Sequence, residues 1–309
     1  MRIRLPGIST DSAPQMGDNV KSTDVLTAAR IQETAIDADG RVDADLAGRV
    51  REVLDDQGIA LIHGFPREPD AYVAFLRTFG EPFENYSASG KMHDDEPHPV
   101  LNRVKYRAPE TRQSSSVHYI DGSLTPHSAR AWTDPRPAFF SMYMVDAGWR
   151  DLPAGQNGES IFVRWHDLFK NEAADQDFQS HLKILTESPL VFRSKNVEEA
   201  ISELPLVYPL SDAQDEFDHG VRMKQDLLAV LGDNKGGSEI GPEYLAAAEA
   251  LVAAAARSTN QIQFNMETGD VVIVDNDRVS HGRTGMVGES EIDGERALNP
   301  REIWSTTLR

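Results

Sequence analysis

The stretch METGDVVIVDNDRVSHGRTG, residues 266–285, carries the pattern that decides the fold. A polar turn at 268–270 precedes the apolar run VVIV, and a second polar turn, DND, separates that run from another short strand. Val279 and His281 lie two residues apart, so a strand would point both side chains to the same face. The pattern therefore predicts two consecutive strands joined by a turn, with a histidine on the second.

Other segments of strand-like composition lie upstream, separated by Pro, Gly and Asp clusters. They cover residues 100–106, 114–120, 123–132, 138–147 and 160–165. A mainly helical portion, roughly 165–258, then separates them from the 266–285 stretch and a last strand, REIWSTTL. Strands on both sides of a helical insertion predict one antiparallel double sheet. The expected fold is mostly β with flanking helices, a double-stranded β-helix (jelly roll) with a helical insertion.

The rest of the chain fits one domain covering residues 1–309. Residues 1–25 are polar and rich in turn formers, and we expect an N-terminal arm there. Leu46, Val50 and Leu54 recur at helical spacing within 43–57, which predicts an amphipathic helix that covers one sheet.

Composition narrows the classes of partner. The chain has 309 residues, 39% of them hydrophobic, which suits a packed core. It has no apolar run of about 18 residues and no signal-peptide pattern near its start, so we expect a cytoplasmic protein without a membrane partner. Its net charge of −19 would repel a nucleic acid, which leaves a small-molecule substrate as the expected partner. The sequence leaves the oligomeric state open.

The absence of cysteine narrows the metal chemistry. With no thiolate in the chain, disulfides, iron–sulfur clusters and thiolate-bound zinc are excluded. Any metal must then be held by His, Asp or Glu.

The 266–285 stretch resembles the iron(II)- and 2-oxoglutarate-dependent oxygenases of the taurine dioxygenase and clavaminate synthase-like group. In that family a "GD…DN…HGRT" segment supplies the distal iron-binding histidine, here His281. A later arginine binds the 2-oxoglutarate carboxylate, and Arg301, which precedes EIW, matches it, with Arg296 as the alternative. The family's GGET turn corresponds to Gly158-Glu159-Ser160, so the resemblance implies that Ser160 helps to hold the cosubstrate.

The resemblance also implies a first iron-binding histidine, followed two residues later by Asp or Glu. His127 matches the histidine, but Ala129 stands in the place of the carboxylate. Two imidazoles and a carboxylate normally occupy one face of iron(II), and a methyl group cannot be a ligand. The family's radical halogenases have Ala or Gly there, and chloride or bromide binds iron in the vacated position.

The resemblance thus favours a halogenase that uses iron(II), 2-oxoglutarate, O2 and chloride or bromide. It would chlorinate an unactivated aliphatic carbon of a small amino-acid-like or nucleoside-like metabolite, with Ala129 beside the halide. One alternative is a hydroxylase of the same superfamily whose Asp or Glu at position 129 was changed to Ala. Another is an inactive binding protein on the same fold. A further alternative draws the third ligand from the literal His-x-Asp at His93-Asp94-Asp95.

Overall fold

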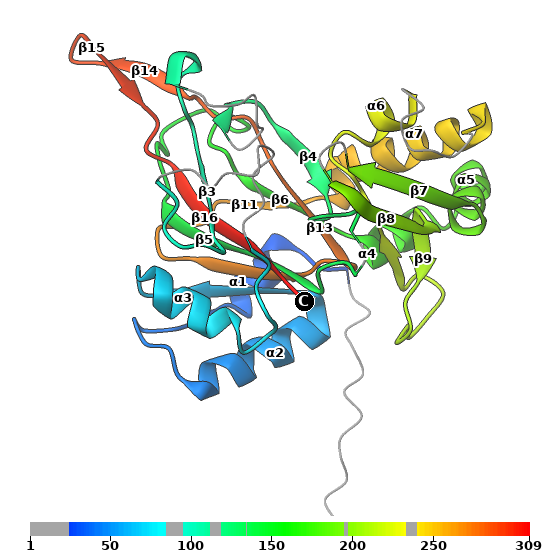
Figure 1. Ribbon diagram of the computed structural model, residues 1–309, viewed down its shortest axis with the longest axis horizontal. Coiled ribbons are helices and arrows are strands. Elements are labelled where there is room, and N and C mark those ends of the chain that lie inside the picture. The colour runs from blue at the N-terminus through cyan, green and yellow to red at the C-terminus, as the bar shows by residue number, and fades with distance from the viewer. Residues whose placement is uncertain (1–24, 85–94, 112–118, 134, 195–196, 233–239) are drawn as a thin grey trace, which may run out of the picture.

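Two β-sheets form the centre of the computed structural model, which describes residues 25–84, 95–111, 119–133, 135–194, 197–232 and 240–309 (Figure 1). The larger sheet has six strands, in the spatial order β1 (Ile36–Asp37), β2 (Ile59–His63), β12 (Val271–Asp275), β5 (Phe139–Asp146), β16 (Glu302–Leu308) and β3 (Asn102–Lys105). The smaller sheet has four, in the order β11 (Ile262–Phe264), β6 (Ser160–Arg164), β13 (Val279–Arg283) and β4 (Leu124–His127). Neighbouring strands are antiparallel except β1 and β2, which are parallel.

The core between the sheets follows the alternation of side chains along each strand. Val272 and Val274 of β12 belong to the same buried cluster as Phe162 of β6 and Val279 of β13. The alternate residues of β12, Val271 and Ile273, belong to a different cluster on the outer face of the larger sheet. The predicted strand pair within 266–285 is confirmed, and so is the prediction of a mostly β protein with flanking helices.

The insertion between β6 and β11 has a hydrophobic core of its own. Its helices are α4 (Trp165–Asn171), α5 (Gln176–Glu187), α6 (Leu227–Gly232) and α7 (Pro242–Ala256). It also contains two pairs of antiparallel strands, β7 (Pro189–Ser194) with β8 (Val197–Pro205), and β9 (Val207–Pro209) with β10 (His219–Val221). The prediction of a mainly helical insertion missed these strands, which pair only with each other.

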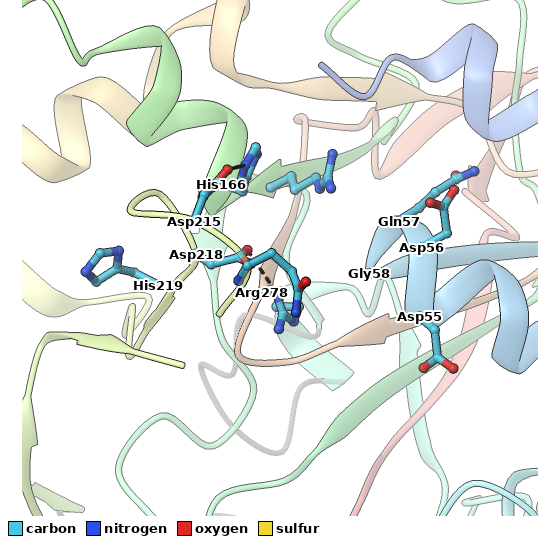
Figure 2. Close-up of a pocket in the computed structure, with 11 residues that line it drawn as sticks. Asp55, Asp56, Gln57, Gly58, His166, Asp215, Asp218, His219 and Arg278 are labelled. Carbon is cyan, nitrogen blue, oxygen red and sulfur yellow. Dashed lines mark hydrogen bonds and ion pairs between the residues drawn. The ribbon is translucent and has the colours of Figure 1, made fainter. Parts of the chain in front are cut away.

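A cluster of charged and polar side chains connects the insertion to the start of β13 (Figure 2). We call this cluster the polar joint; it consists of His166, Asp215, Asp218 and Arg278. His166 Nε2 lies 3.1 Å from an Asp215 carboxylate oxygen, and Arg278 donates to Asp218 over 2.9 Å. The Arg278 carbonyl accepts a bond of 3.0 Å from the Trp165 amide at the start of α4. The joint therefore fixes the insertion against the strand that carries His281.

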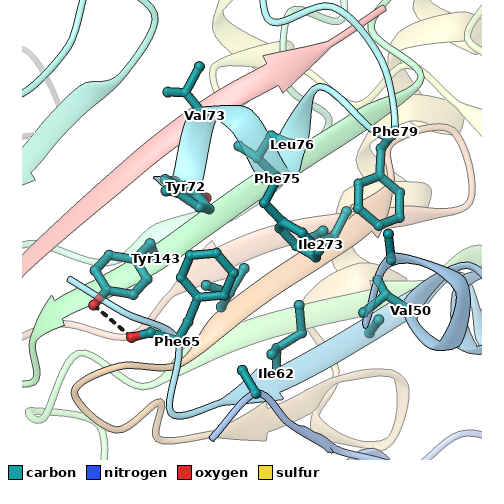
Figure 3. Packing of buried hydrophobic residues seen from close by; sticks show 14 of the residues in the cluster. Val50, Ile62, Phe65, Tyr72, Val73, Phe75, Leu76, Phe79, Tyr143 and Ile273 are labelled. Carbon is teal, nitrogen blue, oxygen red and sulfur yellow. Dashed lines mark hydrogen bonds between the residues drawn. The ribbon is translucent and has the colours of Figure 1, made fainter. Parts of the chain in front are cut away.

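Helices cover the outer face of the larger sheet. The helix α2 (Ala44–Gln57) is capped at its N-terminus by Asp43, whose side chain accepts from the Leu46 amide. Gly58 caps its C-terminus with a φ of 74°, a conformation that glycine adopts readily. The 43–57 prediction is thus confirmed. With α3 (Pro69–Leu76), α2 packs on residues such as Ile273 of β12 (Figure 3).

The remaining helices and the terminal segment complete the description. The short helix α1 (Ala28–Glu33) contacts β2, and its Ile31 lies in the core between the sheets. Of the predicted arm at 1–25, only residue 25 is among the described residues. No helix in the described ranges has the length and apolar character needed to cross a membrane.

Candidate metal centre

His127 and His281 lie side by side in the smaller sheet. His281 of β13 stands directly opposite His127 of β4, and the two ring centroids are 4.4 Å apart. The buried His281 ring also stacks on Phe140 of the facing sheet, with a centroid distance of 3.8 Å and an interplanar angle of 13°. Strand pairing therefore brings together two imidazoles that are 154 positions apart in sequence (281 minus 127).

Hydrogen bonding sets the tautomer of His127. Its Nδ1 lies 2.9 Å from the Thr125 carbonyl oxygen, which can only accept, so Nδ1 carries the proton and Nε2 carries the lone pair. Burial lowers the pKa of the His127 imidazole, while the Thr125 carbonyl opposes that shift. The neutral form with a free Nε2 lone pair is the form that binds a metal ion.

Ala129 lies outside the strand, contrary to the prediction of a strand over 123–132. β4 ends at His127, because the Ser128 amide donates to the Met223 carbonyl of the insertion over 2.7 Å instead of joining β13. Arg130 then has a φ of 49°, a left-handed conformation that turns the chain. His127 and Ala129 are therefore not paired by the alternation of a strand, and contacts outside β4 fix the position of residue 129.

No carboxylate completes the histidine pair in the part of the chain that the structure describes. The Ala129 methyl packs against the apolar cluster between the sheets, which also includes Phe140. Across the described ranges, no third His, Asp or Glu joins His127 and His281 in a group with ligand atoms within 4.8 Å of one another.

The alternative His-x-Asp lies partly outside the described residues, which exclude His93 and Asp94. Asp95 is described, and its carboxylate contacts Arg107 at 2.8 Å and Lys105 at 3.1 Å. Burial raises the pKa of this carboxyl, but the hydrogen bonds from Arg107 and Lys105 outweigh it and hold the pKa well below its usual range. Asp95 is thus engaged in an ion-pair cluster beside β3.

Arg301 is a buried cation at the start of β16. Its side chain donates from Nη2 to the Gly158 carbonyl over 3.0 Å, while its Nε has no hydrogen-bond partner among the described residues. Burial, together with the nearby cations Arg283 and Arg150 and against the opposing effect of Glu159, lowers the pKa of Arg301 to about 9. Because a buried cation is costly without a counter-charge, this site favours an anionic ligand.

Ser160 stands at the start of β6, two positions after Gly158, whose carbonyl accepts from Arg301. It is 2% exposed, and it stands opposite Arg283 in the sheet. The preceding Glu159 is locked to the segment after His281, because its amide donates to the Thr284 hydroxyl over 2.9 Å and its carboxylate accepts from the same hydroxyl. The GES and HGRT segments are therefore held together as one unit, and Gly158 of the first segment contacts Arg301.

Arg296 lies elsewhere, on a hairpin of β14 (Glu289–Ile292) and β15 (Glu295–Leu298) that projects from the body in Figure 1. Its side chain is 51% exposed and forms ion pairs with Glu110 and Glu289. The hairpin lies within the 20 positions that separate His281 from Arg301 (301 minus 281). Of the two candidate arginines, Arg301 is therefore the buried one, and it contacts Gly158.

The polar joint contains a different group of potential metal ligands, His166, Asp215 and Asp218. Its atoms are already engaged, since Asp218 bonds Arg278 and the Gln214 amide while His166 lies between two carboxylates. A metal ion would have to displace the Arg278 cation. We therefore assign the joint a structural role and not a metal-binding one.

An open cavity of about 380 Å³ lies beside the segment that follows Thr284. Its lining includes Gly155, Gln156, Asp121 and Met286. The Gly158 amide donates to the Gly285 carbonyl over 2.9 Å, so the loop that contacts Arg301 forms part of the same region. The cavity therefore lies beside the loop whose Gly158 carbonyl accepts from Arg301.

Several solved structures share the fold of this chain. The chain superposes on a taurine dioxygenase from Burkholderia xenovorans with a TM-score of 0.55 and 17% identity, covering 88% of this chain and 84% of that one. An asparagine oxygenase in complex with Fe(II), 3-hydroxyasparagine and succinate gives a TM-score of 0.58 at 16% identity, over 86% and 79% of the two chains. A non-heme iron oxygenase, OrfP, in complex with Fe and α-ketoglutaric acid gives 0.55 at 14% identity, over 91% and 81%. All three neighbours are oxygenases, and the second and third were solved with iron bound.

The sequence agrees with this class. The profile of the taurine catabolism dioxygenase TauD, TfdA family matches residues 22–299, and the chain belongs to that family. No curated protein matches the sequence closely enough to count as a relative. The resemblance expected from the 266–285 stretch is therefore confirmed at the level of the superfamily.

Proposed function

We propose that this protein is an iron(II)- and 2-oxoglutarate-dependent halogenase that acts on an aliphatic carbon of a small metabolite. One observation carries the proposal: two histidines suited to iron lie side by side while the residue in the place of the third ligand is Ala129. We further infer that the two facing sheets are the expected jelly roll.

His127 and His281 would hold the iron. The free Nε2 lone pair of His127 and the proximity of the two rings fit a metal ion that takes imidazole ligands. Arg301 would bind the distal carboxylate of 2-oxoglutarate, since its buried Nε lacks a partner among the described residues and a guanidinium can grip a carboxylate through two bonds. Ser160 would add a hydroxyl contact.

The overall reaction balances with these components. A substrate C–H, 2-oxoglutarate, O2, chloride and one proton give a C–Cl product, succinate, CO2 and water. When bound, iron and 2-oxoglutarate supply the oxidising power that removes the substrate hydrogen. The chain's own part is to hold 2-oxoglutarate through Arg301, to leave space for the halide beside Ala129, and to position the substrate carbon near that halide.

The identity of the residue at position 129 decides between halogenation and hydroxylation. A methyl group leaves a coordination position open to an external anion, whereas a carboxylate would fill it. The residues of the cluster that Ala129 packs against are apolar, so a halide there would be held mainly by the iron. Under the hydroxylase alternative, an Asp or Glu that was replaced by Ala129 would be the native third ligand.

A turnover experiment tests the proposal. The protein is incubated with iron(II), 2-oxoglutarate, chloride or bromide, O2 and a panel of amino acids and nucleosides, and products are identified by mass spectrometry. We expect a halogenated product whose mass changes with the halide, and Ala129→Asp should abolish it. Succinate with only hydroxylated product would contradict halogenation. A lack of iron binding by the wild type would favour the inactive binding protein.

A further inference from the structure

Asn276, in the turn between β12 and β13, makes an unusual pair of contacts with residue 129. Its side-chain carbonyl accepts from the Ala129 amide over 2.8 Å, and its side-chain amide donates to the Ala129 carbonyl over 3.0 Å. The same amide also donates to the Pro137 carbonyl over 3.2 Å, and Asn276 is 1% exposed. Only one orientation of the amide satisfies both backbone groups of residue 129, so the contact is directional.

These contacts take the place of strand pairing. β13 pairs with β4 at His127 and at Leu124, and residue 129 lies beyond that ladder. Ala129 is half-buried, and its backbone N–H and C=O would otherwise lack these partners, at a cost in stability. The Asn276 side chain therefore holds residue 129 in the way that a neighbouring strand would.

The insertion holds the preceding residue from another side. The Ser128 amide donates to the Met223 carbonyl and the Ser128 hydroxyl to the Val221 carbonyl, both over 2.7 Å. Residues 128 and 129 are thus fixed by two separate elements directly after the His127 strand. The turn that supplies Asn276 leads from β12 of the larger sheet into β13 of the smaller one, which carries His281 five positions later. One connection therefore places both a candidate ligand and the backbone of residue 129.

We propose that Asn276 is a positioning residue that fixes residue 129 and thereby sets the place of the open coordination position beside His127 and His281. This inference rests on the proposed function in so far as that position is the halide site. A carboxylate at position 129 would be held partly by its own bond to the metal. An alanine has no such bond, so contacts to its backbone must hold residue 129 and the open coordination position beside it. We call the two hydrogen bonds from Asn276 to the Ala129 backbone the clamp.

The clamp can be tested through iron binding, without reference to halogenation. Ala129→Asp adds a carboxylate beside the two histidines, and we expect it to tighten anaerobic Fe(II) binding by at least about 10-fold. Combining it with Asn276→Ala should remove most of that gain, because the carboxylate is no longer held in position. The matched control is Asn260→Ala: Asn260 is also buried and makes three side-chain hydrogen bonds, but with Asn171, Glu172 and Ala254.

Halide binding gives the second measurement. Bromide is titrated into the anaerobic complex of the wild type with Fe(II) and 2-oxoglutarate, and Asn276→Ala should weaken its binding by about 10-fold or more while Asn260→Ala leaves it unchanged. Asn276→Asp keeps the acceptor for the Ala129 amide and loses the donor to its carbonyl, so an intermediate loss is expected. Circular dichroism establishes that each variant is folded.

The outcomes separate the two proposals. The positioning role is wrong if Ala129→Asp keeps its full gain in Fe(II) affinity when Asn276→Ala is added. It is also wrong if Asn276→Ala and Asn260→Ala lower the Fe(II) or bromide affinity equally. If the wild-type complex binds no bromide, the halogenase proposal fails, and the Fe(II) measurements with Ala129→Asp still decide whether Asn276 positions residue 129.

Discussion

Replacement of Arg301 by Met tests the cosubstrate site most sharply. Arg301 is 2% exposed, and its Nε has no partner among the described residues, so the side chain can give a carboxylate two charge-assisted hydrogen bonds. Each such bond contributes about 1.5–3 kcal/mol. The loss of two therefore weakens 2-oxoglutarate binding by about 3–6 kcal/mol, or roughly 10²- to 10⁴-fold. Anaerobic isothermal titration calorimetry with Fe(II) present measures the affinity directly.

The matched control is Arg296→Met. Arg296 is 51% exposed and paired with Glu110 and Glu289, so its replacement should leave 2-oxoglutarate affinity unchanged. Arg301→Met should not destabilise the ligand-free fold, because it replaces a buried cation by an apolar side chain of similar length. The reasoning is refuted if Arg301→Met binds 2-oxoglutarate as the wild type does, or if Arg296→Met loses it.

Three further predictions concern the metal centre, the cosubstrate site and the polar joint. His127→Gln should abolish tight Fe(II) binding in equilibrium dialysis, and unchanged binding would exclude His127 as a ligand. Ser160→Ala should weaken 2-oxoglutarate binding roughly 2- to 10-fold, the value of one neutral hydrogen bond; no change in calorimetry would remove Ser160 from the site. The carboxylates of Asp167 and Asp215 raise the pKa of His166 above its ordinary 6.5. The stability that His166 contributes is therefore full below pH 6.5 and is lost as the pH rises through the raised pKa. Thermal melts of wild type and His166→Gln should converge with increasing pH, and a gap that widens would contradict the assignment.

The elements with a clear local pattern were predicted from the sequence. Apolar spacing and flanking residues placed the helix 43–57, found at 44–57, and the strand pair within 266–285. His281 and His127 were both placed on strands, and the structure pairs those strands directly. Local periodicity was sufficient because each of these elements buries at least one face in an apolar cluster.

The features that were missed depend on contacts between distant residues. The end of β4 at His127 is set by Met223 and Asn276, which lie 95 and 147 residues away from the positions they bond (223 minus 128 and 276 minus 129). No local pattern in 123–132 reveals such partners. Asn276 belongs to the "DN" of the 266–285 stretch, and its role emerges only when the turn is seen against residue 129.

The choice between Arg296 and Arg301 was also beyond the sequence. Both arginines lie next to residues with strand-like composition, so the sequence kept Arg296 as an alternative to Arg301. Burial distinguishes them in the structure: Arg296 is exposed on the β14–β15 hairpin, whereas Arg301 is buried and contacts Gly158. Burial results from the packing of the whole chain, which spacing in the sequence does not encode.

The most direct test of the halide site is a crystal structure of the wild-type protein with Fe(II), 2-oxoglutarate and bromide, grown without O2 and measured at the bromine absorption edge. The proposal predicts an anomalous peak for a bromide ion that is bound to the iron beside the Ala129 methyl. A peak beside Arg301 or in the polar joint would not be this site. Iron held by His127 and His281 with only water or a protein carboxylate in that position would contradict it.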